Sequence, residues 1–152
     1  TEDECCIGIV CCPLTVYGYP MDFRGMVQYW AGGRAFGRLA DESVRCNAFF
    51  PYPEDVQARH NAMMWRNVSA SGKLGDLPWK DFVNHPDYSS FVDVFEGAMT
   101  CSRGVWRSEM NSCMNSRIPY YNTISRYEIM RRIMEHSGEA FSMDFFIEND
   151  EL

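Results

Sequence analysis

Histidine is scarce in this sequence of 152 residues. There are three, His60, His85 and His136, and no two of them are three or four residues apart. A helix that binds zinc through its own side chains needs two histidines at that spacing, so the sequence contains no self-contained zinc-binding helix. We expect His60 to be a packed or surface residue of a helix. His85 precedes a proline in a loop, and His136 falls in a last helical turn, where a cation suits the helix dipole.

Positive charge and long apolar runs are also lacking. Lys and Arg total 14 against 21 Asp and Glu, which gives a formal net charge of -7 at pH 7. Nucleic-acid binding draws on a surplus of basic residues that displaces counterions from phosphates, so we expect no nucleic-acid partner. No stretch approaches the length of a membrane-spanning helix, so we expect no membrane insertion. The acidic start Thr1–Glu4 is unlike the basic opening of a signal peptide, so we expect no targeting segment in this chain.

Internal repeats, low-complexity tracts and long flexible linkers are absent. We therefore expect one domain over residues 1–152. Hydrophobic residues make up 46% and charged residues 23% of the sequence, which is typical of a globular protein. The seven cysteines are an odd number, so at least one thiol stays outside any intrachain disulfide. Their spacing differs from that of a zinc ribbon, and small buried apolar residues are their expected role.

The apolar pattern predicts an α+β fold in which helices prevail over a small sheet. Strands are expected over 5–12, a continuous apolar run, and over 91–95, which alternates. Helices are predicted over 22–40, 53–67, 78–83, 125–138 and 143–147. In the clearest helix, Ser125 and Glu128 have the spacing of a capping box, and Gly138 is the expected end. The stretch after Asp41-Glu42 is expected to be irregular, and 111–116 has turn chemistry.

The helix predicted over 22–40 contains Gly32, Gly33 and Gly37. Each glycine in a helix interior costs about 1 kcal/mol relative to alanine. Close packing against another element, or a bend, is therefore needed to explain them. The run from Gly32-Gly33 through Ala35-Phe36-Gly37-Arg38-Leu39-Ala40 to Asp41-Glu42 is more specific than an ordinary amphipathic helix.

Further landmarks follow this run in the sequence. They are Trp65-Arg66-Asn67, Phe95-Glu96-Gly97, Arg103 to Glu109, Asn111 to Asn115, Ser125-Arg126 and Arg132-Ile133-Met134. In this order they resemble the bacterial zinc metallopeptidases named after immunoglobulin-A peptidase, a metzincin-like family. The resemblance covers most of this chain but only the C-terminal half of a family catalytic domain. It implies a metallopeptidase-like domain, shortened on its N-terminal side, with an extracellular or cell-envelope location.

This chain departs from the family at the zinc site. The family places a His-Glu pair and a second His around the glycines, where this chain has Tyr29, Trp30 and Arg34. Tyr29 and Arg34 stand at ligand positions, and Trp30 stands at the general-base position. A phenol is a poor ligand at neutral pH, an indole cannot act as a base, and a guanidinium is a fixed cation. Asp41 resembles the remaining acidic ligand, but one carboxylate does not hold a catalytic zinc. Because of these departures, the resemblance implies that this chain has no catalytic residue, no metal ligand and no cofactor.

Met114 lies in a segment that resembles the methionine turn beneath the metal of related peptidases. There the thioether forms an apolar floor, and an ordinary gap-filling methionine is the alternative. Together with Gly32, Gly33 and Gly37, Met114 marks the expected cleft.

Arg34 is expected to take over part of the electrostatic role of the lost metal. We expect its guanidinium to contact the carboxylate of Asp41 or Glu42. Pairing of Asp41 with Arg38 is another reading of the same residues.

The leading interpretation is a non-catalytic pseudopeptidase with a cleft that binds a peptide or protein ligand. The alternative from a different class is a working zinc endopeptidase that recruits His60 or His85 as ligands. A structural interaction domain without a cleft function is the third. Zinc content separates the first two interpretations, and peptide binding separates the first from the third.

Overall fold

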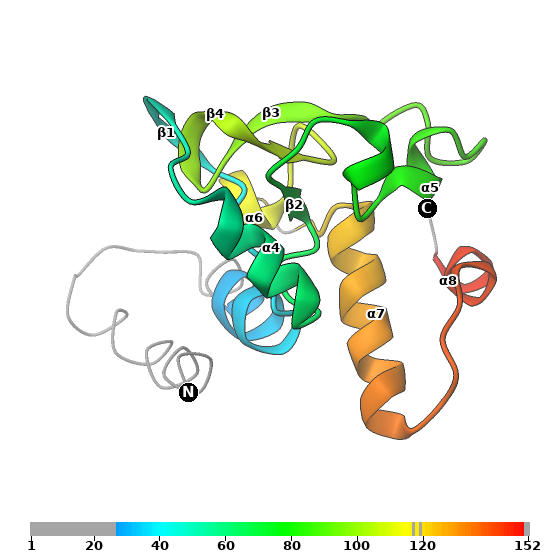
Figure 1. Ribbon diagram of the computed structural model, residues 1–152. Coiled ribbons are helices and arrows are strands. Elements are labelled where there is room, and N and C mark those ends of the chain that lie inside the picture. Colours follow the sequence, from blue (N-terminus) through cyan, green and yellow to red (C-terminus); the bar gives the residue numbers. More distant parts are fainter. Residues whose placement is uncertain (1–26, 117, 119, 151–152) are drawn as a thin grey trace.

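The computed structural model describes residues 27–116, 118 and 120–150. The elements in chain order are the π-helix η1 (Val27–Phe36), β1 (Val44–Phe49), α4 (Pro53–Asn61), β2 (Val68–Ser69), the 3₁₀-helix η2 (Leu74–Asp76), α5 (Lys80–Val83), β3 (Phe95–Ala98), β4 (Thr100–Arg107), α6 (Cys113–Ser116), α7 (Thr123–Ser137) and α8 (Met143–Asn149). The sheet lies at one end of the molecule, with η1 and α7 beneath it (Figure 1). The predicted α+β fold with a small sheet is confirmed.

Strand β4 organises the four-stranded sheet, because the other three strands all pair with it. Strand β1 runs parallel to β4, with Cys46 opposite Cys101. Strands β2 and β3 are antiparallel to β4, and Val68 and Phe95 both pair with Arg107. Among the described strands β1 pairs only with β4, so it lies at an edge of the sheet.

A tight turn at Met99 and Thr100 joins β3 to β4. The φ angles of these two residues are +49° and +67°, as in a two-residue hairpin loop of type I′. The turn is held from outside the hairpin, because the Met99 N–H donates to the Asp41 carbonyl at 2.9 Å and the Thr100 N–H to the Ser43 carbonyl at 2.8 Å. The hairpin therefore anchors the segment that follows η1.

The strand predictions were partly wrong. The stretch after Glu42, expected to be irregular, forms β1, whose apolar and polar residues alternate from Val44 to Ala48 although most of them are exposed. The strand expected over 91–95 begins only at Phe95, because Val92 is buried within a preceding turn. The strand predicted over 5–12 lies outside the described residues.

Each predicted helix has a helical counterpart among the described residues, but the predicted ends were less accurate. The described part of the helix expected over 22–40 is η1, which ends at Phe36. Helix α4 ends at Asn61 rather than near residue 67, because Met63 and Trp65 have φ angles of +56° and +57°, outside the helical region. The segment 111–116, for which turns were predicted, includes the single-turn helix α6. None of the helices in the described ranges has the length and apolar character needed to cross a membrane.

Helix α7 is capped differently from the prediction. Asn122, not Ser125, is the N-cap, and its side chain accepts the Ser125 N–H at 3.0 Å. Glu128 turns away from the helix start and pairs with Arg66 at 3.0 Å and with Arg131 at 2.8 Å. The predicted end is confirmed, because Gly138 follows the last turn in the left-handed conformation.

Three buried clusters of apolar side chains make up the core, and one of them supports η1. Its buried members are Leu39, Cys113 and Met114, with Tyr29, Tyr121 and Ile129 packed against them. Because these side chains come from η1 and its C-terminal extension, from α6 and from the start of α7, the cluster joins the expected cleft to the helices beneath it.

We expect Gly138→Ala to lower the free energy of unfolding by about 1 kcal/mol, because an L-residue is strained at φ +75°. Gly75→Ala is the matched control, since neither position has any atom within 4 Å of an added Cβ and only Gly138 has a positive φ. The control should change stability by less than about 0.5 kcal/mol. Urea denaturation measures both. Equal effects would contradict the left-handed cap.

Candidate functional site

Helix η1 lies directly on the turn that contains Met114. A Cβ added to Gly33 would overlap the Met114 sulfur, and the Met114 side chain is fully buried. The turn itself is fixed, because the Met114 N–H donates to Ser112 Oγ at 3.0 Å. Met114 thus forms an apolar floor under the glycine-rich part of η1.

The other two glycines of this segment also meet neighbouring side chains. A Cβ on Gly32 would overlap the Tyr121 hydroxyl, and one on Gly37 would lie 2.9 Å from Ile129 Cγ1. The Gly37 N–H donates to the Gly32 carbonyl at 2.8 Å, which is the wider spacing of a π-helical turn. Close packing against α7 and the loop before it therefore explains the glycines, as expected from their energetic cost.

The side chains that the resemblance assigns to metal-ligand positions lie near one another. The negative charge of Asp41 and the positive charge of Arg34 both act on the Tyr29 phenol. Burial, followed by the negative charge of Asp41, raises the pKa of Tyr29 to about 12. The phenol therefore keeps its proton at neutral pH.

Trp30 lies at the centre of this group. Its ring meets Tyr29 edge-on at a centroid distance of 5.0 Å, and the Arg34 guanidinium carbon lies 6.0 Å from its ring centroid. An indole ring can hold a cation over its face but has no lone pair with which to take a proton. The group can bind a ligand, and it has no base at the Trp30 position.

The ion pair expected for Arg34 does not form. Within residues 27–116, 118 and 120–150 no carboxylate oxygen lies within 4.0 Å of its guanidinium. Asp41 instead accepts the Ser43 N–H at 2.7 Å and lies 3.5 Å from Arg45 Nη2, so its pairing with Arg34 or Arg38 was wrong. The physical reason is the turn of the chain into β1, which presents Arg45 to Asp41. Arg34 is left with its charge facing Trp30.

These residues do not fit a zinc ion. Tyr29 is protonated, Arg34 is a cation, and Asp41 already accepts the Ser43 N–H and pairs with Arg45. No group of three or more His, Cys, Asp or Glu side chains in the described part of the chain is arranged to hold a metal. A metal needs several deprotonated donors around one point.

Neither histidine of the alternative interpretation takes part in this group. His60 Nε2 lies 2.9 Å from the Val68 carbonyl and 3.2 Å from that of Trp65, so this nitrogen carries a proton and faces the backbone. Burial lowers the pKa of His60. His85 Nδ1 accepts the Asp87 N–H at 3.3 Å. Both imidazoles therefore have structural roles, His60 in the last turn of α4 and His85 in the loop after α5.

Glu42 is a buried carboxylate for which the sequence reasoning found no role beyond an expected pairing with Arg34. Its side chain accepts hydrogen bonds from Ser112 Oγ at 2.7 Å, Asn67 Nδ2 at 2.8 Å and Asn122 Nδ2 at 3.0 Å. Its own N–H donates to the Met114 carbonyl at 2.9 Å. Glu42 therefore ties the end of the glycine-rich segment to the Met114 turn and to the start of α7.

Burial is the main cause that raises the pKa of Glu42 to about 7, and the negative charge of Glu109 adds to it. The three hydrogen bonds act in the opposite direction, because they favour the charged form. The negative charge of Glu42 also acts on Arg107, where it partly offsets the lowering of the Arg107 pKa by burial. The sequence gives no signal of this role, because Glu42 lies among the polar residues Asp41, Ser43 and Arg45.

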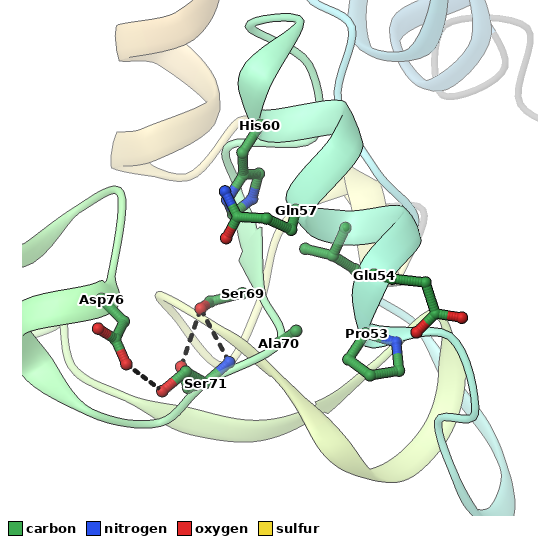
Figure 2. Close-up of a pocket in the computed structure, with 9 residues that line it drawn as sticks. Pro53, Glu54, Gln57, His60, Ser69, Ala70, Ser71 and Asp76 are labelled. Atoms are coloured by element: carbon green, nitrogen blue, oxygen red, sulfur yellow. Dashed lines mark hydrogen bonds between the residues drawn. The ribbon is translucent and has the colours of Figure 1, made fainter.

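A separate polar pocket of about 530 Å³ lies between α4 and the segment that leads from β2 to η2. It is lined by Pro53, Glu54, Val56, Gln57, His60, Ser69, Ala70, Ser71 and Asp76. Figure 2 shows how its polar groups bind one another: Ser71 Oγ donates to Asp76 at 2.7 Å, and Ser69 Oγ donates to the Ser71 carbonyl at 2.8 Å. Because these groups already have partners, we place the candidate site at η1 rather than here.

Comparison with protein-family models and with curated proteins gave no match for this sequence. The assignment of a function therefore rests on the geometry around η1 and on the resemblance of the residues themselves.

Gly33→Ala should lower the free energy of unfolding by about 1–3 kcal/mol, because the added methyl overlaps the buried Met114 sulfur. The double variant Gly33→Ala/Met114→Ala should lose at least about 0.5 kcal/mol less stability than the sum of the losses in the two single variants. Chemical denaturation of the two single variants and the double variant measures this coupling. Strictly additive costs would show that the two residues do not touch.

Glu42→Gln should remove a pH dependence of stability. Because the pKa of Glu42 is about 7 in the folded protein against its usual 4.5, the folded protein binds this proton more tightly than the unfolded chain. The stabilisation is fully present below pH 4.5 and is lost as the pH rises through about 7. The loss is on the order of 3 kcal/mol.

Urea denaturation of the parent and of Glu42→Gln across this pH range measures the difference. His60, whose pKa is lowered, acts in the opposite direction, but it is present in both proteins and cancels in the comparison. Parallel pH profiles for the two proteins would contradict the assignment.

Proposed function

We propose that this chain is a metallopeptidase-like domain that has lost hydrolysis and binds an extended peptide at the η1 site. The observation that carries the proposal is the gathering of Tyr29, Trp30, Arg34 and Asp41 beside the Met114 floor without a set of metal ligands. The resemblance assigns these residues to the family's metal-site positions, and their chemistry does not suit a metal. The same resemblance leads us to propose an extracellular or cell-envelope location.

The loss of hydrolysis follows from the side chains themselves. Peptide hydrolysis by this kind of site needs a polarising group and a base that takes a proton from water. Trp30 cannot accept a proton, and Asp41 already accepts the Ser43 N–H and pairs with Arg45. Glu42, the nearby carboxylate with a raised pKa, has 0% of its surface exposed and cannot reach a substrate.

The edge strand β1 offers backbone groups to a peptide. It follows Asp41 closely in the chain, and among the described strands it pairs only with β4. Its residues are mostly exposed, including Val44 at 46% and Phe49 at 64%. An extended peptide can add to such an edge through main-chain hydrogen bonds, with its side chains giving specificity.

Arg34 provides a selective contact for that peptide. Its guanidinium has no carboxylate partner within the described ranges, and it faces the Trp30 ring. Arginine binds carboxylates through two parallel hydrogen bonds when it is not already paired. We therefore propose that the preferred peptide has an acidic side chain or its C-terminal carboxylate near Arg34.

Binding of short synthetic peptides to the purified chain tests this proposal. Peptides that contain Asp or Glu should bind more tightly than their Asn and Gln counterparts, and Arg34→Ala should weaken that binding by about tenfold or more. Arg103→Ala is the matched control, because Arg103 is an exposed arginine on β4, and it should leave the affinity unchanged.

Other outcomes identify the rival functions. Absence of binding by any peptide would favour a structural interaction domain. Peptide cleavage that a chelator stops would favour a working zinc endopeptidase. Binding that Arg34→Ala and Arg103→Ala reduce equally would contradict the place of the site.

A further inference from the structure

Two cysteines stand opposite each other across the parallel strands β1 and β4. Cys46 pairs with Cys101 in the register of the sheet. Cys46 Sγ lies 3.1 Å from the Thr100 carbonyl, and Cys46 is close enough to Cys101 to raise the pKa of its thiol. Cys46 is exposed, whereas Cys101 is 8% exposed. One thiol is thus open to reagents in solution and the other lies directly behind it.

The geometry of this pair suits a covalent link. Neighbouring strands of a sheet are about 4.8 Å apart, and disulfides join residues whose Cα atoms are about 4.4–6.8 Å apart. Register shifts flank Cys46 on both sides of its pairing with Cys101, so β1 has local freedom to adjust to the S–S bond. No backbone rearrangement between distant elements is needed.

We propose that Cys46 and Cys101 are a thiol–disulfide exchange site that reacts with small disulfides, such as oxidised glutathione, to form a cross-strand disulfide. The Cys46 thiolate attacks one sulfur of the small disulfide, forms a mixed disulfide and releases one small thiolate. The Cys101 thiolate then attacks the Cys46 sulfur, forms the protein disulfide and releases the second small thiolate. Two protons leave the protein, and the small disulfide is reduced to two thiols.

The surroundings of the two thiols set this order of events. Burial raises the pKa of Cys101, and the neighbouring Cys46 adds to the effect, so its thiolate is scarce and it does not attack first. A thiol must be ionised to attack a disulfide. The exposed Cys46 therefore captures the reagent, and Cys101 resolves the mixed disulfide more readily as the pH rises.

Cys113 provides an internal comparison. It is buried, and burial raises the pKa of its thiol to about 12. No other described cysteine contacts it. We expect it to stay reduced under conditions that link Cys46 to Cys101.

The test is oxidation of the folded full chain with oxidised glutathione, followed by alkylation of the remaining thiols, trypsin digestion and mass spectrometry. Trypsin cuts after Lys and Arg, so Cys46 is released in peptide 46–59, Cys101 in 81–103 and Cys113 in 108–117. The other four cysteines all fall in peptide 1–24. Each pairing of these peptides therefore has its own mass.

The expected result is one dominant linked species, 46–59 joined to 81–103, which a reductant separates. Formation of this bond should raise the midpoint of thermal unfolding by roughly 5–10 °C. A glutathione adduct that persists on 46–59, or a link from 46–59 to either of the other cysteine peptides, would overturn the proposal.

Two variants complete the test. Cys46→Ser changes an exposed side chain, and in this variant Cys101 should stay reduced and alkylatable after unfolding. Cys113→Ser should leave the linked peptide unchanged. Rapid glutathione capture by Cys101 in the Cys46→Ser variant would contradict the order of attack, and circular dichroism shows that each variant is folded.

Discussion

The site depends on one buried carboxylate, that of Glu42. Three donors, from Asn67, Ser112 and Asn122, converge on it. These residues lie 25, 70 and 80 positions from Glu42 in the sequence, and Asn122 is also the N-cap of α7. A charged group without these partners would be too costly to bury. The local structure of all three segments therefore depends on Glu42, and its burial fixes the place where η1 gives way to the sheet.

From this point the chain positions the candidate site in both directions. Towards the N-terminus, η1 packs on Met114 through Gly33, so no larger residue fits there. On either side of Glu42, the carbonyls of Asp41 and Ser43 accept hydrogen bonds from the turn between β3 and β4. After Ser43 the chain continues as the exposed edge strand β1. The scaffold around η1 is thus tightly specified. Tyr29, Trp30 and Arg34 lie near one another on this scaffold, and we propose them as the contacts for a ligand with carboxylate groups.

The sequence predicted the glycine packing, the helix that ends at Gly138 and the α+β class, because each depends on local propensity or on a residue with a specific conformational role. It missed the β3–β4 hairpin, since Met99 and Thr100 adopt positive φ angles that Asn-Gly would normally signal. It missed β1 although Val44 to Ala48 alternates between apolar and polar residues, because so short an alternation is a weak signal of a strand whose residues are mostly exposed. It placed Arg34 on a carboxylate, because nothing in the sequence shows that β1 brings Arg45 to Asp41 first.

The proposed function requires that the residues around η1, Tyr29, Arg34 and Asp41, do not hold a catalytic metal. Elemental analysis of the purified chain, after incubation with excess zinc and removal of unbound ions, tests this claim most directly. The account predicts zinc near zero per chain, because Tyr29 is protonated and Arg34 is positively charged. Zinc near one per chain, retained by the parent and lost in Asp41→Asn, would contradict it.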